Sequence, residues 1–319
     1  MSVGPIIRTE QLERHFGEVE ALKGIDLEVD TGSVRGLLGP NGAGKTTCIR
    51  ILTTLLLPSA GRAEVDGLDV VKDAEELRYR IGLAGQSAAV DENLTGLENL
   101  EMVGRLYGLP KAEARKRSGE ILERFGLSDA TDRQAKTYSG GMRRRLDVAS
   151  SLVGRPDILF LDEPTTGLDP RSRVDVWAFV RELQSDGTTI LLTTQYLEEA
   201  DQLADDIVVL DHGRVAAAGS PAQLKAQIGG ERLDVTVAGE EHLARAVDAL
   251  AAFADGQANS DAASLQVTVP VRFGTRLMEV ARALDAAHVD VTDVHRREAT
   301  LDDVFLTLTG ADSAPRKAA

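Results

Sequence analysis

A glycine-rich loop at residues 39–47 has the residue types and spacing needed to hold a triphosphate. It reads Gly-Pro-Asn-Gly-Ala-Gly-Lys-Thr-Thr and directly follows the apolar run 34–38. Glycines let successive backbone N–H groups turn toward phosphate oxygens, and the dipole of a helix opening at Gly44 favours the same anion. Lys45 is placed to reach the β- and γ-phosphates, and the Thr46 hydroxyl to ligate Mg²⁺. The predicted nucleotide-binding residues of this loop are Gly39, Asn41, Gly42, Ala43, Gly44, Lys45, Thr46 and Thr47.

A second group of chemically capable residues is the acidic pair Asp162-Glu163, which ends the apolar run 158–162. Ligands of an open α/β sheet lie at the carboxyl ends of its strands. There an aspartate can hold Mg²⁺ through water, and a glutamate can act as the base for the water that attacks the γ-phosphate. A structural glycine turn and a solvated acidic turn are the alternative interpretations. The glycine turn is disfavoured because all four fixed positions of the phosphate-loop pattern are present, and the acidic turn because the chain already carries that loop.

The run Tyr138-Ser139-Gly140-Gly141-Met142-Arg143 resembles the Leu-Ser-Gly-Gly-Gln signature of ATP-binding-cassette proteins, with the first and last residues changed. Ser139 can cap the helix that follows it, while the amides of Gly140 and Gly141 face an anion. The run precedes the strand ending in Asp162-Glu163, as it does in that family. The resemblance covers residues 6–225 and implies ATP as the nucleotide.

The resemblance also implies roles for residues that no local pattern identifies. Gln86 matches the glutamine loop that senses Mg²⁺ and the attacking water, and residues 167–169 match a loop that contacts a second copy. Phe16 occupies the position of an aromatic residue that stacks on adenine, although a phenylalanine of the core is nearly as consistent. Gln195 replaces the family's usual histidine, and its amide can donate a hydrogen bond but has no titratable proton. The catalytic set is therefore predicted as Glu163, Gln195 and Lys45, and the Mg²⁺ set as Thr46, Gln86 and Asp162.

The family's geometry implies that two identical copies enclose two nucleotides, with Ser139, Gly140 and Gly141 of one copy facing Lys45 of the other. The runs 193–201 and 299–310 are similar to those of the ATP-binding subunits of daunorubicin/doxorubicin-resistance exporters. This narrower resemblance implies a peripheral ATPase at the cytoplasmic face of the membrane. It implies export of a hydrophobic drug or lipid-like compound through a separate multi-span permease, with no drug site in this chain.

The elements that must position these residues follow a pattern of alternating strands and helices. Strands are expected at 34–38, 81–84, 158–162, 189–194 and 207–211, which is typical of a largely parallel α/β sheet. Residues 95–153 carry helical patterns with no strand between them, so a helical subdomain is expected to be inserted there. We expect an ATP-binding domain over residues 1–228, a small α+β domain of regulation or assembly over 229–310, and a loose tail over 311–319.

Composition narrows the remaining function classes. The 319 residues carry a formal net charge of −15, which argues against nucleic acid as a partner. The single cysteine, Cys48, excludes an internal disulfide, and its place after the loop suggests that nucleotide would protect it from alkylation. The apolar runs are too short to span a bilayer. A cassette ATPase that works without a membrane, and a nucleotide switch that barely hydrolyses, stay open as alternatives.

Overall fold

The computed structural model describes residues 4–85, 90–228, 231–256, 258–272 and 274–309, and its contacts divide the chain into two compact units, Met1–Ser220 and Pro221–Ala319. This division precedes the Gly229-Gly230 pair at which the sequence suggested a boundary, and that pair lies outside the described residues. The physical reason is that helix α8 (Pro221–Gln227) packs against α11 (Leu301–Thr309), so α8 belongs to the second unit.

A six-stranded sheet forms the centre of the first unit, in the order β10-β9-β3-β8-β7-β6. The strands are β3 (Val34–Leu38), β6 (Ile81–Ala84), β7 (Ile158–Asp162), β8 (Thr189–Thr194), β9 (Asp206–Asp211) and β10 (Arg214–Gly219). Every pair is parallel except the pair of β9 with β10. The carboxyl ends of β3, β7 and β8 therefore meet at one edge, where Asp162 ends β7 and Glu163 follows it.

The two faces of this sheet bury different cores, and β7 shows how the sequence assigns them. Because side chains alternate across a strand, Leu159 and Leu161 join one hydrophobic cluster, whereas Ile158 and Phe160 join the other. All five residues of β7 are buried, as expected for a central strand covered on both sides.

An antiparallel sheet, ordered β2-β1-β4-β5, forms a second layer in the first unit that the sequence analysis did not anticipate. Its strands are β1 (Ile7–Phe16), β2 (Val19–Val29), β4 (Ala60–Val65) and β5 (Leu68–Asp69), and the short helix α2 (Ala74–Arg78) follows them. Apolar residues of β1 and β2 share one core with helix α1 (Lys45–Leu52). The strand pairing is irregular at Leu12, which interrupts the alternation of apolar and polar residues along β1. Periodicity in the sequence therefore did not predict these strands.

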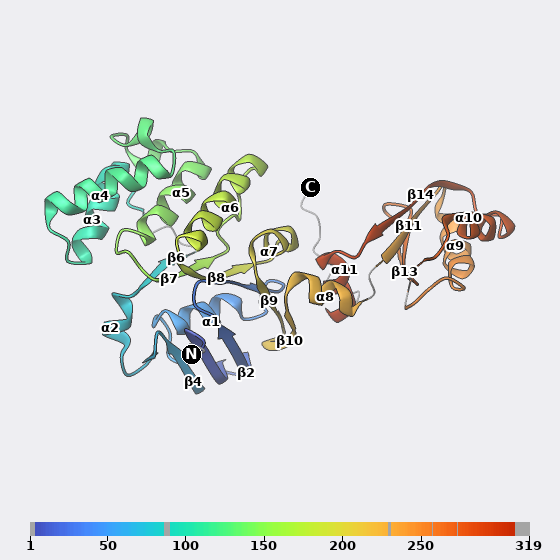
Figure 1. Cartoon of the computed structure of the whole chain (residues 1–319), viewed down its shortest axis with the longest axis horizontal. Helices are drawn as coiled ribbons and strands as arrows, with labels where there is room; N and C mark the ends of the chain where they lie inside the picture. Colours follow the sequence, from blue (N-terminus) through green and yellow to red (C-terminus); the bar gives the residue numbers. More distant parts are fainter. Residues whose placement is uncertain (1–3, 86–89, 229–230, 257, 273, 310–319) are drawn as a thin grey trace. The chain divides into compact units, whose positions relative to one another are not determined.

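Helices lie on the other side of the central sheet, and the first two of them lie farther out, beside α5 (Gly140–Ser151) (Figure 1). They are α3 (Gly96–Leu106), α4 (Lys111–Arg124), α5 (Gly140–Ser151), α6 (Pro170–Ser185) and α7 (Leu197–Leu203). No strand interrupts the described residues between α3 and α5, and α3 begins with a capping box in which Thr95 accepts from the Glu98 N–H.

The second unit has the strand-helix-strand-strand-helix-strand order of a ferredoxin-like domain. Its sheet runs β12-β13-β11-β14 and every pair is antiparallel. The elements are β11 (Glu231–Val237), α9 (Leu243–Leu250), β12 (Asn259–Asp261), β13 (Gln266–Val271), α10 (Leu277–Ala286) and β14 (Val291–Glu298). Leu233, Val235 and Val237 of β11 join the core of this unit, so Arg232 and Asp234 face the opposite side of the sheet.

Candidate functional site

The loop of residues 39–47 needs glycine at two positions for steric reasons. Gly44 has φ +107°, and a Cβ atom there would lie 2.6 Å from the carbonyl oxygen of Ala21 in β2. A Cβ atom on Gly39 would lie 2.4 Å from the carbonyl oxygen of Leu210 in β9. The loop is therefore pressed against neighbouring strands, and only glycine lets its backbone curve there. Such a backbone cradle fits a phosphate chain.

Lys45 lies inside this cradle with its side chain only 4% exposed. Its Nζ atom donates to the carbonyl oxygens of Gly39, at 2.7 Å, and Pro40, at 3.0 Å. Nζ also lies 3.6 Å from Oε1 of Glu163. Burial lowers the pKa of Lys45, while the charges of Glu163 and Asp162 act in the opposite direction. The Lys45 ammonium therefore contacts both the loop and the acidic pair, which are far apart along the chain.

Thr46 and Asp162 supply oxygen donors of the kind that Mg²⁺ prefers. The Thr46 hydroxyl donates to Oδ1 of Asp162 at 3.1 Å, and Thr193 of β8 donates to the same oxygen at 2.6 Å. Among the described residues no group of three His, Cys, Asp or Glu side chains could hold a metal. The donor set fits a magnesium ion whose remaining ligands are phosphate and water. Sequence reasoning missed Thr193, because its role arises from the pairing of β7 with β8.

Glu163 occupies a backbone conformation that is unfavourable for a residue with a side chain. Its φ is +52°, in the left-handed region. Its N–H donates to the carbonyl oxygen of Thr193 at 3.1 Å and to the Thr193 hydroxyl at 3.0 Å, and Thr166 donates to its Oε2 at 3.2 Å. Surrounding contacts therefore hold a strained residue in place, which is typical of functional sites.

The predicted signature run lies at the amino end of α5. Ser139 is the N-cap, and its side chain accepts from the Met142 N–H. A Cβ atom on Gly141 would lie 2.8 Å from Oγ of Ser172 in α6, so the two helices approach closely there. Asp169 caps α6 by accepting from the N–H and the hydroxyl of Ser172, and these bonds lower the pKa of Asp169. Ser139 and Gly140 are exposed, so the positive end of α5 is open to an anion.

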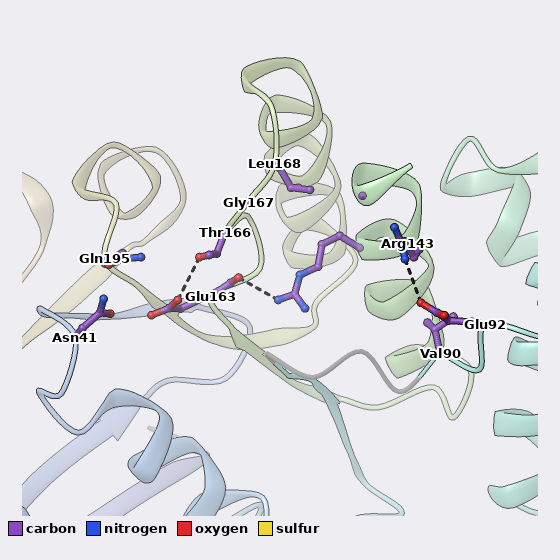
Figure 2. Close-up of a pocket in the computed structure, with 11 residues that line it drawn as sticks. Asn41, Val90, Glu92, Arg143, Glu163, Thr166, Gly167, Leu168 and Gln195 are labelled. Atoms are coloured by element: carbon purple, nitrogen blue, oxygen red, sulfur yellow. Dashed lines mark hydrogen bonds and ion pairs between the residues drawn. The ribbon is translucent and has the colours of Figure 1, made fainter. Parts of the chain in front are cut away.

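One cavity of about 700 Å³ brings several predicted residues together. Its lining includes Asn41 of the loop, Glu163, Gly140 and Gln195, and Figure 2 shows Asn41 and Gln195 lying beside Glu163. The same figure shows Arg143 paired with Glu92 at another part of the lining. A single copy thus forms an open groove that runs from the phosphate loop to the signature run.

Phe16 lies apart from this cavity lining but close to the loop in the fold. It ends β1, is 47% exposed, and pairs with Val19 in the strand whose Ala21 touches Gly44. The guanidinium of Arg14 stacks 4.7 Å from the centroid of its ring. An exposed ring is consistent with stacking on a base and inconsistent with a core phenylalanine.

Three further predicted residues have simpler outcomes. Ala43 is buried in the loop, Thr47 is half-buried in the first turn of α1, and Gln86 lies outside the described residues.

Cys48 is fully buried, and burial raises its pKa to about 12. This burial argues against the expectation that nucleotide would control alkylation of Cys48, because the protein itself shields the thiol.

The chain shares its cassette with known transporter subunits. A family model described as "ABC transporter" matches residues 22–166. The daunorubicin resistance ATP-binding protein DrrA2 of Streptomyces coeruleorubidus is 55% identical over 308 residues, which are 96% of this chain and 96% of that protein. The daunorubicin/doxorubicin resistance ATP-binding protein DrrA of Streptomyces peucetius is 49% identical, over 95% of this chain and 92% of that protein.

Solved structures cover the first unit. A dimeric ATP-binding cassette in a post-hydrolysis state, bound to ADP and Pi, is 26% identical, with a TM-score of 0.62 over 67% of this chain and 98% of its own. The predicted fold class, an α/β cassette with an additional C-terminal region, is confirmed. The phosphate cradle, the acidic pair and the near full-length similarity together show that the chain belongs to the ABC transporter family, as an ATPase subunit closely related to the daunorubicin/doxorubicin resistance ATP-binding proteins.

Proposed function

We propose that two copies of this chain hydrolyse ATP between them and thereby power export of a hydrophobic drug or lipid-like compound. The observation that carries this proposal is the meeting of the loop and the acidic pair. Nζ of Lys45 lies 3.6 Å from Glu163, and Oγ1 of Thr46 lies 3.1 Å from Asp162. A cation, a hydroxyl and two carboxylates are thus gathered beside a phosphate cradle.

In this proposal, binding and chemistry fall to different residues. The backbone of residues 39–47 and Nζ of Lys45 bind the phosphates, and Lys45 exchanges its two carbonyl acceptors for phosphate oxygens. Phe16 stacks on adenine. The carboxylate of Glu163 accepts a proton from the attacking water, whose oxygen bonds to the γ-phosphorus as the bond to ADP breaks. The Gln195 amide donates a hydrogen bond that orients the γ-phosphate.

Thr46 and Asp162 would hold Mg²⁺, together with Gln86. The ion would neutralise charge on the phosphate oxygens as it develops. Thr193 keeps the Asp162 carboxylate aimed at the Thr46 hydroxyl, since both hydroxyls donate to the same oxygen.

The proposed assembly is a homodimer in which each site is completed by the other copy. Ser139, Gly140 and Gly141 at the amino end of α5 face the γ-phosphate held by the partner. This end is exposed, and its own first turn carries no acidic residue, so the helix itself does not oppose an anion there. The similar cassette that was solved as a dimer with ADP and Pi supports this arrangement.

A separate multi-span permease would provide the membrane path, with this chain attached at the cytoplasmic face. Among the described residues, no helix is long and apolar enough to cross a bilayer. The names of the related resistance proteins point to daunorubicin and doxorubicin as the kind of compound exported.

The test compares phosphate release by the purified chain with that by Glu163→Gln. We expect the variant to lose turnover by about 100-fold or more while ATP binding persists, because only the proton acceptor is removed. Glu198→Gln, an exposed glutamate outside the site, is the matched control. Turnover of the unaltered chain no higher than that of Glu163→Gln would refute the catalytic assignment. Export is tested separately, by doxorubicin accumulation in cells that express the chain with a co-purifying permease.

A further inference from the structure

Arg144 makes an unusual set of contacts for a residue with no assigned role. It lies in α5, one turn after Ser139, and its side chain is 12% exposed. Its three guanidinium nitrogens donate five hydrogen bonds. The acceptors are the carbonyl oxygens of Gly85 (2.5 Å), Asp162 (3.0 Å), Glu163 (3.0 Å) and Pro164 (2.8 Å), and Oδ2 of Asp147 (2.8 Å).

Three of these acceptors place Arg144 against the carboxyl end of β7, next to the proposed catalytic residue Glu163. Asp162, Glu163 and Pro164 form the turn that leaves β7, and the carbonyls of all three point at one guanidinium. Thr193 holds the N–H side of Glu163 from β8. The strained Glu163 backbone, with φ +52°, is therefore held by Thr193 on one side and by Arg144 on the other.

The remaining contacts tie the same guanidinium to two further segments. Gly85 ends the described residues that follow β6 and directly precedes residues 86–89. Asp147 is 2% exposed and lies one turn further along α5, so it fixes the direction of the guanidinium from its own helix. A planar group with five donors can serve all of these acceptors together, which a lysine ammonium cannot.

We infer that Arg144 is a positioning residue that couples the two ATP sites of the dimer. This inference rests on the proposed function, in which the amino end of α5 faces the nucleotide of the partner. A shift of α5 on contact with that nucleotide reaches, through Arg144, the turn that carries Glu163 of the same chain. Each copy thereby registers the partner's ATP at its own catalytic carboxylate.

Arg117 provides a matched control within the same helical subdomain. Its Nε donates to the carbonyl oxygen of Val153 at 2.7 Å, and its Nη2 to that of Leu152 at 2.8 Å. Like Arg144, it is a partly buried arginine that serves backbone carbonyls next to α5. Arg117 belongs to α4 and contacts the residues that follow the carboxyl end of α5, away from the site. Its replacement therefore reports only the effect of losing a structural arginine in this subdomain.

The experiment measures ATP-dependent dimerisation of the full chain in a Glu163→Gln background, which prevents turnover. Light scattering gives the ATP concentration at half-dimerisation, and a fluorescent ATP analogue gives the affinity of the monomer. With Arg144→Met we expect half-dimerisation to require about tenfold more ATP. We expect the monomer affinity to change by less than about twofold, because Arg144 does not touch the loop of residues 39–47.

Two further variants separate positioning from folding. Arg117→Met should leave both values unchanged. Arg144→Lys should give an intermediate ATP requirement, since an ammonium can replace some of the donors, and it keeps the test valid if Arg144→Met does not fold. If both Arg144 variants reached half-dimerisation at the same ATP concentration as the Glu163→Gln chain with Arg144 intact, the inference would be overturned. The proposed function would then still stand. If Glu163→Gln itself bound ATP but stayed monomeric, the proposal that two copies share each ATP site would be refuted. The coupling through Arg144 would be refuted with it.

Discussion

Glu199 is a carboxyl group buried within the first unit, next to segments that shape the site. It is 0% exposed, and Trp177 of α6 donates to its Oε1 at 3.1 Å. Its Oε2 and the hydroxyl of Thr165 are buried without a hydrogen bond in the part of the chain that the structure describes. Burial raises the pKa of Glu199, against smaller opposing effects of the Trp177 hydrogen bond and the charge of Arg173. Ionisation of Glu199 therefore opposes folding.

We expect Glu199→Gln to stabilise the protein at neutral pH. Glu199 titrates near its ordinary value of 4.5 when unfolded and at a higher pH when folded. The unfolded chain thus loses this proton first, and stability falls as the pH rises from 4.5 through the folded pKa. The variant escapes this fall, and its amide can donate to the Thr165 hydroxyl. The melting temperature should rise by about 2–4 °C for each kcal/mol gained.

Melting curves at pH 4.5 and pH 8 check this prediction. The gain should be present at pH 8 and largely absent at the lower pH, where the carboxyl is protonated in the folded state and about half protonated in the unfolded state. The adjacent exposed glutamate, in Glu198→Gln, should show no gain at either pH. A variant that melts below the unaltered chain at pH 8 would show that the charged form is the stabilising one.

Helix α5 combines two functions at its amino end, because one residue both caps the helix and faces the proposed phosphate. The Ser139 side chain accepts from the Met142 N–H, which satisfies one of the free donors of the first turn. The other free N–H groups and the helix dipole attract an anion. A negative side chain would serve as a cap but would repel the phosphate.

We therefore expect Ser139→Asp to fold normally and to lose catalysis. Aspartate caps helices about as well as serine, so the unfolding free energy should change by less than about 0.5 kcal/mol. ATP-driven dimerisation and phosphate release should fall by about tenfold or more, because two anions would meet at the amino end of α5. Denaturant unfolding and phosphate release measure the two effects.

The control for this prediction is another helix cap outside the site. Thr95 caps α3 and accepts from the Glu98 N–H at 3.2 Å. Thr95→Asp should leave phosphate release unchanged. Full activity of Ser139→Asp would mean that this helix end does not approach the phosphate.

The whole molecule consists of two units, and the second contains an ionic cluster that binds its last described helix to its sheet. Arg297 of β14 donates to Asp303 of α11 at 2.6 Å and to Asp234 of β11 at 2.7 Å. Asp303 also accepts from the N–H and hydroxyl of Thr300. Burial opposes ionisation of Asp303, but the hydrogen bonds of Arg297 and Thr300 prevail and lower its pKa.

We expect Asp303→Asn to destabilise the second unit by about 2 kcal/mol, less than the loss of a fully buried pair would cost, because Arg297 is 30% exposed. A carboxylate with a lowered folded pKa contributes stability above its unfolded value of 3.8, and this contribution is lost as the pH falls through the folded pKa. The difference between variant and unaltered chain should therefore be full at pH 7 and shrink below pH 3.8.

Hydrogen exchange of the β11 and β14 amides measures this effect, while ATP binding by the first unit should stay unchanged. An exposed aspartate of α9 in the same unit supplies a control in Asp248→Asn, for which no change in exchange is expected. Exchange in the Asp303 variant equal to that of the unaltered chain would show that α11 is held by its apolar side chains alone.

The sequence by itself determined the elements whose signals are local. Strand β7 matched its prediction over Ile158–Asp162 because an uninterrupted apolar run can only be buried, and α5 began at Gly140 because Ser139 is a strong cap. The loop of residues 39–47 was recognisable because a phosphate cradle constrains residues that are adjacent in the chain. The order of these motifs also sufficed to identify the family.

Only the tertiary structure decided which distant residues act together. Thr193 and Arg144 carry no local signal, since a threonine in a strand and an arginine in a helix are unremarkable until β8 and α5 pack beside the turn at Glu163. The buried state of Cys48 and Glu199 likewise depends on neighbours from other elements. Helix caps, turns and strand preferences depend on a few neighbouring residues, so the sequence shows them directly. Hydrogen bonds and desolvation between distant residues depend on their positions in space, so these contacts exist only in the folded chain.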